Sequence, residues 1–306
     1  MRTALAVLLT AITLLAQGAE KNGFNLADAL IPEDEIHSGG PLRDGIPSID
    51  KPGFVKPAAA QFLQADDRVL GITRNGVSKA YPIAILNWHE IVNDDFAGEP
   101  VVVSFCPLCG TGMAYRATVD DQVLEFGVSG LLYNSDMLLY DRQTESLWSQ
   151  ISRQSVSGPM KGVKLQVIPA EHTQWADWKQ RHPGTQVLST ETGYKRDYTR
   201  NPYAGYGVSR KLYFPVAQQD QRYHPKEPVL GVELAGQYKA YPFKELKQSG
   251  AAVTDSLAGQ IIVVKYDQRH NAATAVDEQG KLLPAVTAYW FAWYAFHPDT
   301  GVYVAE

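Results

Sequence analysis

The chain has 306 residues and a formal net charge of −5 at pH 7, with 45% hydrophobic and 20% charged residues. This composition is ordinary for a globular protein, and the length allows a substantial core in one or two domains. The acidic balance and the lack of any lysine or arginine run argue against nucleic acid or an anionic membrane surface as the partner. The 16 tyrosines and 6 tryptophans favour a β-rich fold.

The first residues of the chain have the order of charges and apolar residues of a secretory signal peptide. Arg2 precedes an uncharged, mostly apolar stretch from Ala4 to Ala16, and Gly18 provides a second small residue at the expected cleavage site. The apolar stretch is short for a membrane span. We therefore expect a signal peptide over residues 1–18, a periplasmic or secreted mature protein, and no membrane span after cleavage. An uncleaved N-terminal anchor is the alternative.

Two stretches of the chain are closely similar. Residues 69–86 read VLGITRNGVSKAYPIAIL and residues 229–246 read VLGVELAGQYKAYPFKEL, with nine identities in 18 positions. Such self-similarity indicates an internal duplication of one structural unit. The fold class that we expect is mainly β, a β-rich α+β protein made of two homologous β units and a partly helical connector.

The repeat also predicts how the mature chain is divided. The expected parts are an extended N-terminal arm over residues 19–65, a first β-rich repeat over 66–150, a connector over 151–226 and a second repeat without thiols over 227–306. We expect the likeness to continue through residues 94–105 beside 255–266, and to end with 138–148 beside 294–303.

The local sequence predicts the elements of the first repeat in chain order. We expect a hairpin turning at Asn75-Gly76, a short helix over 84–92, a buried strand over 99–106, a hairpin turning at Asp120-Asp121 and one further strand over 131–141. In the connector, residues 170–182 form a helix candidate that Pro183 ends.

Both cysteines of the sequence, Cys106 and Cys109, lie in the motif CPLCG. In thioredoxin-like enzymes a CxxC motif opens a helix, whose dipole lowers the thiol pKa. Here GTGMAYRATV follows, which indicates a turn that enters a strand. A Cys-Pro-x-Cys-Gly turn between strands is typical of a zinc-ribbon or rubredoxin-like metal knuckle. The second repeat has Asp267 and His270 at these positions, so the thiols serve something that only the first repeat does.

One such knuckle supplies only two ligands of a tetrahedral site. The candidates for the others are His89, at the end of the predicted helix, and Met137, on the strand after the hairpin. Two thiolates with a thioether and an imidazole form a soft set that favours copper(I). Zinc is the alternative, bound by Cys106, Cys109 and His89 with Asp136 or water completing the shell.

Several longer motifs occur together along the chain: WHEIVND, SFCPLCGT, GLLYNSDMLLYDRQTESLWSQ and FAWYAFHPDT. In this order they resemble the exported microbial family catalogued as domain of unknown function 3179. The resemblance spans nearly the whole mature chain and implies no particular activity. Its signature stretches contain one set of residues: His89, Cys106, Cys109, Asn134, Asp136, Met137 and Arg142. Of these, we expect Asn134, Asp136 and Arg142 to support the site.

The sequence leaves three functions open. The leading expectation is an exported metal-binding protein that uses the CPLC knuckle for copper, as a carrier or as a redox cofactor site. Besides the metal ion, its partner would be a small molecule or a protein of the cell envelope. One alternative is a thiol–disulfide oxidoreductase that uses Cys106 and Cys109. The other is an envelope binding module in which the thiols are structural or joined as a disulfide.

Overall fold

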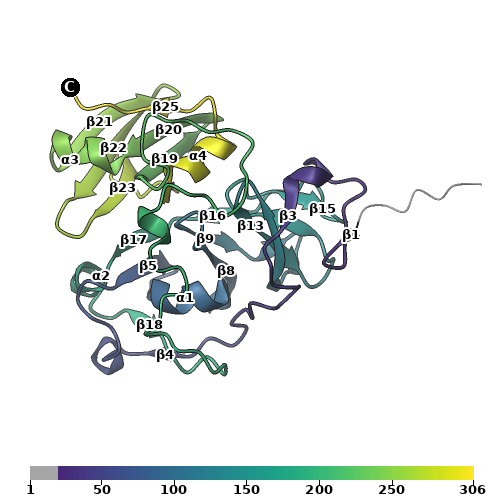
Figure 1. The fold of residues 1–306 in the computed structure, drawn as a ribbon. Coiled ribbons are helices and arrows are strands. Elements are labelled where there is room, and N and C mark those ends of the chain that lie inside the picture. The colour runs from purple at the N-terminus through teal and green to yellow at the C-terminus, as the bar shows by residue number, and fades with distance from the viewer. Residues whose placement is uncertain (1–19) are drawn as a thin grey trace, which may run out of the picture.

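The computed structural model of the protein describes residues 20–306. The predicted signal peptide, residues 1–18, therefore lies outside the described residues. The fold is mainly β, as the sequence predicts, and consists of several small sheets (Figure 1). Between residues 20 and 306, no helix has the length and apolar character that a membrane crossing requires.

The first unit of the fold is built from residues 54–188. Its elements are β4 (Phe54–Val55), β5 (Arg68–Arg74), β6 (Val77–Pro82), α1 (Ile83–His89), β7 (Ile91–Phe96), β8 (Glu99–Cys106), β9 (Thr111–Arg116), β16 (Val167–Ile168), β17 (Glu171–Gln174), α2 (Trp175–Arg181) and β18 (Gln186–Leu188). They form one sheet in the order β17–β5–β6–β18–β4 and another in the order β16–β9–β8–β7. Positive φ angles at Asn75 (50°) and Gly76 (75°) confirm the expected hairpin turn. The helix expected over 84–92 ends at His89, because the next residue has a φ of 58°.

The second unit has the same order of elements as the first, except that β4 and β16 have no counterpart in it. It contains β19 (Pro228–Leu234), β20 (Gln237–Pro242), α3 (Phe243–Ser249), β21 (Ala252–Leu257), β22 (Gln260–Asp267), β23 (Ala272–Asp277), β24 (Val286–Tyr289), α4 (Trp290–Phe296) and β25 (Gly301–Val302). Its sheets have the orders β24–β19–β20–β25 and β21–β22–β23. Val229 pairs with Pro242 as Val69 pairs with Pro82, so the two first hairpins have the same register.

In each unit, a tryptophan ring packs against a glycine of the first strand. A Cβ atom added to Gly71 would lie 2.3 Å from the ring of Trp178, and one added to Gly231 would lie 2.1 Å from the ring of Trp293. These tryptophans belong to α2 and α4. The strand–helix–strand segment β17–α2–β18 therefore occupies in the first unit the place that β24–α4–β25 occupies in the second.

The observed units differ from the expected repeat boundaries. Residues 171–188, expected in the connector over 151–226, complete the first unit and correspond to residues 286–302. The expected pairing of residues 138–148 with 294–303 is wrong, because the former belong to a different sheet. The first unit thus carries a long insertion between β9 and β16. The shared order of elements is what a duplication predicts.

The insertion forms a third sheet together with part of the N-terminal arm. Its strands are β3 (Ile36–Ser38), β12 (Phe126–Tyr133), β13 (Asp136–Asp141), β14 (Leu147–Ser149) and β15 (Ser155–Ser157), in the order β15–β14–β13–β12–β3. The single strand expected over 131–141 is wrong: Asn134 and Ser135 have φ angles of 52° and 63° and turn the chain into a two-residue hairpin.

Smaller elements complete the described chain. They are β1 (Glu20–Lys21), β2 (Phe24–Asn25), β10 (Thr118–Val119), β11 (Gln122–Val123) and three 3-10 helices, Glu33–Glu35, Pro57–Ala59 and Tyr206–Val208. β10 and β11 form the hairpin that the sequence predicts at Asp120-Asp121.

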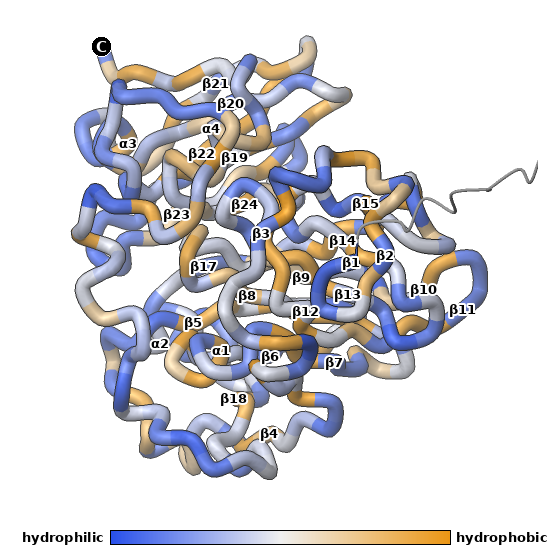
Figure 2. The backbone as a smooth tube through the Cα atoms, turned by 45° about the vertical axis from the view of Figure 1, so that its right-hand side comes forward, coloured by the Kyte–Doolittle hydropathy of each residue, from blue (hydrophilic) through white to orange (hydrophobic). Residues whose placement is uncertain are grey.

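One hydrophobic core joins the first unit, the inserted sheet and α4. Val102 of β8, Leu139 of β13 and Phe291 of α4 are among its buried members, together with Cys106 and Cys109. Figure 2 shows apolar, orange stretches on the strands around β9 and β13. The two units also touch reciprocally, since β24 lies against β9 and β17 lies against β23. The thiols therefore lie inside the protein, where three parts of the chain meet.

Candidate functional site

The two cysteines lie in a tight turn between two strands. β8 ends at Cys106 and β9 begins at Thr111, so the CPLC motif itself does not open a helix. Gly110 has a φ of 61°, and a Cβ atom there would lie 2.9 Å from the ring of Tyr289. The backbone N–H of Tyr289 donates a hydrogen bond of 2.8 Å to the carbonyl oxygen of Cys109. The second unit thus covers the turn directly.

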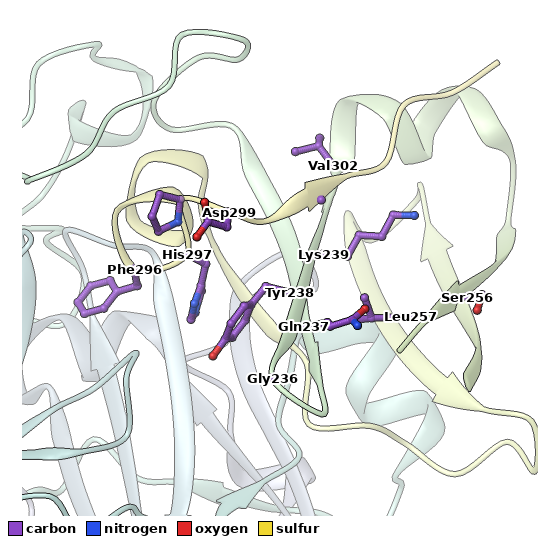
Figure 3. A pocket seen from close by; sticks show the side chains of 12 residues that line it. Gly236, Gln237, Tyr238, Lys239, Ser256, Leu257, Phe296, His297, Asp299 and Val302 are labelled. Atoms are coloured by element: carbon purple, nitrogen blue, oxygen red, sulfur yellow. The ribbon is translucent and has the colours of Figure 1, made fainter. Parts of the chain in front are cut away.

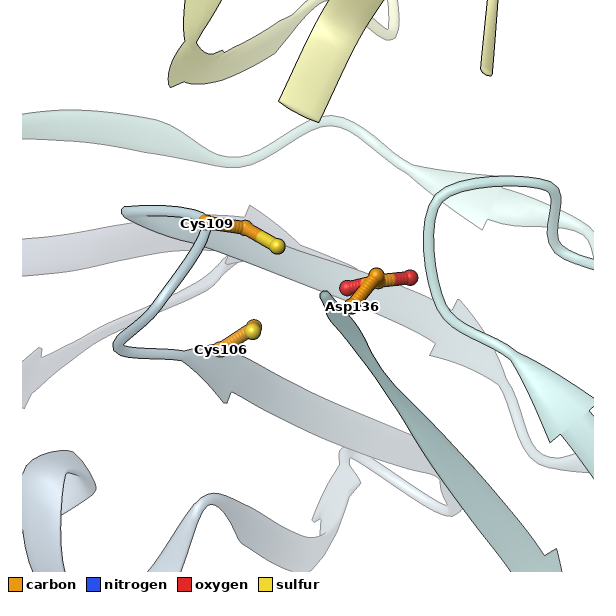
Figure 4. A group of neighbouring side chains, drawn as sticks. All are labelled: Cys106, Cys109 and Asp136. Atoms are coloured by element: carbon orange, nitrogen blue, oxygen red, sulfur yellow. The ribbon is translucent and has the colours of Figure 1, made fainter. Parts of the chain in front are cut away.

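A carboxylate joins the two thiols. The sulfur atoms of Cys106 and Cys109 and one carboxylate oxygen of Asp136 all lie within 4.8 Å of one another (Figure 4). All three residues are buried, with at most 1% of their surface exposed. Asp136 is the first residue of β13, directly after the turn at Asn134-Ser135. The tip of the inserted hairpin therefore brings the carboxylate to the thiol turn.

The hydrogen bonds around these three residues leave one oxygen free. The thiols of Cys109 and Cys106 point at the carbonyl oxygen of Ser135, at 3.4 and 3.9 Å. Oδ2 of Asp136 accepts a hydrogen bond of 3.0 Å from the backbone N–H of Ile151. Oδ1 of Asp136 is buried and has no hydrogen-bond partner among the described residues. A buried acceptor of this kind is energetically costly unless a ligand satisfies it.

Burial sets the protonation of the site. It raises the pKa of Asp136 to about 7 and raises the pKa of Cys106, to which the charge of Asp136 adds. Burial raises the pKa of Cys109 well above its ordinary value. Without a cation, both thiols are therefore protonated at neutral pH and are weak nucleophiles. A bound cation would reverse this, because it favours the charged forms.

Further buried polar atoms around the thiols lack partners. No motif in the sequence predicts that the residues of these atoms lie near the thiols. The described residues contain five buried side-chain atoms without a hydrogen bond, and four belong to Ser135, Asp136, Gln150 and Tyr206. Nε2 of Gln150 donates to the carbonyl oxygen of Thr111 at the end of the turn (3.3 Å). Burial and the nearby Cys109 raise the pKa of Tyr206. This concentration of unsatisfied polar atoms is typical of a site for an ion, water or ligand.

His89 does not join the thiols. Its Nδ1 lies 2.8 Å from the carbonyl oxygen of Pro47, and its Nε2 lies 2.7 Å from the hydroxyl of Tyr198. One ring nitrogen must carry a proton to reach the carbonyl, so the other accepts from the hydroxyl. His89 is also missing from the group of donors around the sulfurs. The expectation that it is a metal ligand is wrong, because both nitrogens already hold the arm and the connector to α1.

Met137 lies beside the site on another face of the strand. It follows Asp136 in β13, and successive strand residues point to opposite faces. Met137 is 2% exposed and packs in the same core as both cysteines. The thioether of Met137 therefore packs near the thiol turn, whereas the carboxylate of Asp136 leaves β13 on the opposite face.

The two remaining residues of the expected set have structural contacts. Asn134 accepts a hydrogen bond from the N–H of Ala217 (2.8 Å) and donates one to the carbonyl oxygen of Ala295 (3.3 Å). Arg142 follows the far end of β13, about 20 Å along the strand from Asp136, and pairs with Asp50 at 2.9 Å. Asn134 thus fixes the hairpin tip, and Arg142 does not reach the thiols.

An apolar cavity of about 270 Å³ adjoins the thiol turn. Leu108, between the two cysteines, and Met137 line it, and Glu90 and Tyr203 provide polar groups. Burial raises the pKa of Glu90 to about 8. The hydroxyl of Tyr203 lies 3.5 Å from Oε1 of Glu90. The sequence offers Glu90 only as an unassigned acid beside His89, so its place at this cavity is information from the fold.

The equivalent turn of the second unit carries a hydrogen-bonded histidine–aspartate pair. Nδ1 of His270 lies 2.7 Å from Oδ2 of Asp267. With Asp177 of α2 they form a second group of donors within 4.8 Å of one another. However, Arg181 binds both carboxylate oxygens of Asp177, at 2.9 and 2.7 Å. This guanidinium takes the place that a cation would need.

A larger hollow of about 650 Å³ lies on the second unit. Figure 3 shows Tyr238, Lys239 and His297 along it, and the rings of Tyr238 and His297 stack with centroids 4.0 Å apart. Lys239 pairs with Asp255 at 2.6 Å. Because its basic group is already neutralised, this hollow offers no arrangement of reactive side chains comparable to the thiol turn.

Comparison with known proteins identifies a family for this chain. Neither the curated proteins nor the solved structures contain a match to the chain. One family model matches residues 43–300, which include every residue of the thiol turn, the inserted hairpin and most of the second unit. The chain therefore belongs to the family described as protein of unknown function (DUF3179).

Proposed function

We propose that this protein binds a d-block metal ion through Cys106, Cys109 and Asp136. The observation that carries the proposal is the placement of two thiol sulfurs and a carboxylate oxygen within 4.8 Å of one another in a fully buried site. Two cysteine sulfurs and an aspartate oxygen are ligands that zinc binds in proteins. The unpartnered Oδ1 of Asp136 supports the same conclusion.

The donor set favours zinc over the copper that the sequence predicts. Zinc accepts cysteine sulfur and aspartate oxygen together, whereas copper(I) prefers thiolate, thioether and imidazole. His89 is engaged elsewhere, so the imidazole is missing. Copper(I) is the second candidate, because Met137 packs in the same core as the thiols and offers a thioether.

A resident metal fits this site better than a transported one. Three protein ligands leave a fourth position for water or a substrate, as in catalytic zinc sites. The second unit covers the turn through Tyr289, so release of the ion would require the units to move apart. The apolar N-terminal stretch favours export, and we extend the proposal to a periplasmic or secreted metalloprotein.

Thiol–disulfide exchange is less well supported. A disulfide of a protein substrate would have to reach the sulfur atoms of two cysteine residues that are 1% and 0% exposed. Burial also raises the pKa of both thiols, which lowers the thiolate fraction available for attack.

The test is metal analysis of protein purified without a metal-affinity tag. Wild type should contain about one equivalent of zinc, and Cys106→Ser, Cys109→Ser and Asp136→Asn should lose it. Asp267→Asn is the matched control, because Asp267 stands in the second unit where Cys106 stands in the first, and it should keep the metal. Metal retained by a double Cys→Ser variant would rule the site out.

A second measurement separates zinc from copper. Metal-free protein is titrated anaerobically with Zn(II) and with Cu(I), using wild type and Met137→Leu. If zinc is the native metal, the substitution should leave its affinity within a factor of about two. A selective loss of Cu(I) affinity in Met137→Leu, with copper present in the purified protein, would favour copper instead.

A further inference from the structure

We propose that the 270 Å³ cavity beside the thiol turn binds a small, mostly apolar organic molecule with one hydrogen-bond donor, an amine or an alcohol, and that Glu90 accepts its hydrogen bond. The proposal also names a class of molecule on which the metal site would act. That part of the proposal rests on the proposed function. The binding itself rests on the cavity alone.

Residues that neighbour the proposed metal ligands in sequence line the cavity. Leu108, which lines it, lies in the turn between Cys106 and Cys109, and Met137, which also lines it, follows Asp136 in β13. A molecule in the cavity therefore lies beside the turn that carries the sulfurs. The rest of the lining comes from β12, from the arm around Pro41 and from Tyr203, Tyr213 and Phe214 of the connector.

Glu90 is the polar group that lacks a firm partner. It is 7% exposed and lines the cavity, yet among residues 20–306 its carboxyl group has a single hydrogen bond, of 3.5 Å, from Tyr203. Its backbone is fixed, because the N–H of Phe105 donates to its carbonyl oxygen over 2.7 Å. This bond holds Glu90 beside the strand residue that precedes Cys106.

The second unit shows that the fold does not need a carboxylate here. Where α1 is joined to β7 by Glu90 alone, α3 is joined to β21 by Gly250 and Ala251. Gly250 takes the positive φ, 90°, and the carbonyl oxygen of Ala251 accepts the equivalent bond from Tyr266 (2.9 Å). Glu90 instead adopts a φ of 58°, which disfavours a residue with a Cβ atom. Neither the turn nor the packing explains a buried glutamate.

The charge and size of the cavity define the class of ligand. No lysine, arginine or histidine is among the residues that line it, all of which the structure describes. An anionic ligand would bury its charge with no positive side chain in the lining to compensate it, which is strongly unfavourable. A hydrogen-bond donor satisfies the carboxyl group, and the rings of Tyr203, Tyr213 and Phe214 also suit a cation. Since a cavity of about 150 Å³ holds benzene, 270 Å³ accommodates one ring with a short side chain.

The test uses three probes of one shape: phenethylamine, 2-phenylethanol and phenylacetate. Binding to the zinc-loaded protein is measured by calorimetry at neutral pH. We expect the amine and the alcohol to bind at least tenfold more tightly than phenylacetate. Glu90→Gln should weaken the amine at least tenfold, and Val128→Phe, which fills the cavity from β12, should abolish binding of both. Metal content and thermal midpoint of each variant show that it is folded.

The outcomes separate this proposal from the metal site. Probes that bind to wild type and to the double Cys→Ser variant, with no metal in either, would refute the metal function and leave the cavity assignment standing. Tight binding of phenylacetate, equal binding by Glu90→Gln, or no binding of any probe at millimolar concentration to a metal-loaded protein would refute the cavity assignment alone.

Discussion

Trp178 and Trp293 make the same contacts in the two units of the fold. The indole N–H of Trp178 donates to Oγ1 of Thr185 over 2.9 Å, and that of Trp293 donates to Oγ1 of Thr300 over 3.0 Å. Each ring covers a glycine of the first strand of its unit. These two tryptophans align the two units with each other. The alignment shows which features, such as the thiol turn and the inserted sheet, occur only in the first unit.

The tryptophan–glycine contacts predict two destabilising substitutions. Gly71→Ala and Gly231→Ala would each place a methyl group inside an indole ring, and overpacking of this kind costs about 1–3 kcal/mol. Denaturant titration should give a lower free energy of unfolding for both. Gly184→Ala is the control, because nothing lies within 4 Å of its added Cβ atom. Equal stability of all three variants would show that the strands can shift to admit the methyl group.

His89 should prove structural. His89→Leu leaves the carbonyl oxygen of Pro47 and the hydroxyl of Tyr198 without their partner, so the free energy of unfolding should fall by about 2 kcal/mol or more. The metal content should stay unchanged. Tyr198→Phe removes one of the two bonds of His89 together with the 2.6 Å bond between Tyr198 and Thr192, so it should also destabilise the fold without changing the metal content. Loss of metal from a folded His89→Leu protein would contradict this assignment.

The stability of the metal-free protein should fall as pH rises. Burial raises the pKa of Asp136 to about 7 and that of Glu90 to about 8, so both carboxyl groups hold their protons longer in the folded chain than in the unfolded chain. Their contribution is complete below pH about 4 and is lost by pH about 8, because the folded chain binds more protons in between. The expected loss is on the order of a few kcal/mol, measured by urea titration at several pH values.

Neutral variants check the origin of this pH dependence. Asp136→Asn and Glu90→Gln remove one titrating group each, so each should flatten the fall in unfolding free energy between pH 4 and 8. Saturating zinc should reverse the trend in wild type, because metal binding releases protons and strengthens with pH. A slope that is the same in all three proteins would assign the titration to other groups.

The bond between the units should protect the thiols. Tyr289→Pro removes the N–H that binds the carbonyl oxygen of Cys109, whereas Tyr289→Ala keeps it and removes only the ring. Reaction of the metal-free protein with a thiol reagent should be slow in wild type and should accelerate more in Tyr289→Pro than in Tyr289→Ala. Equal rates in the two variants would mean that the ring, and not the hydrogen bond, covers the turn.

The sequence predicts the local elements well where turn chemistry and strand pattern agree. The Asn75-Gly76 hairpin, the strand over 99–106 and the Asp120-Asp121 hairpin are all present. The turn at Asn134-Ser135 escapes prediction because apolar residues on both sides suggest one continuous strand. Its consequence is large, since the hairpin turns Asp136 toward the thiols, where a single strand would not.

The long-range part of the site could not be read from spacing alone. An insertion separates residues 171–188 from the rest of the first unit, which hides their likeness to 286–302. The signal is nevertheless present in pairs such as Trp175 with Trp290 and His182 with His297. His89 shows the opposite case. Histidine is a common metal ligand, and only the fold reveals that both of its ring nitrogens have other hydrogen-bond partners.

The hydrogen bond from Tyr289 to Cys109 also orders events during synthesis of the chain. Cys109 emerges from the ribosome before Tyr289, which lies in the second unit much further along the chain. Since chains are made from the N-terminus and early segments begin to fold first, the thiol turn stays open until β24 and α4 arrive. A chain that stops before β24 leaves its thiols uncovered, so closure of this turn reports that the second unit has been made and has docked.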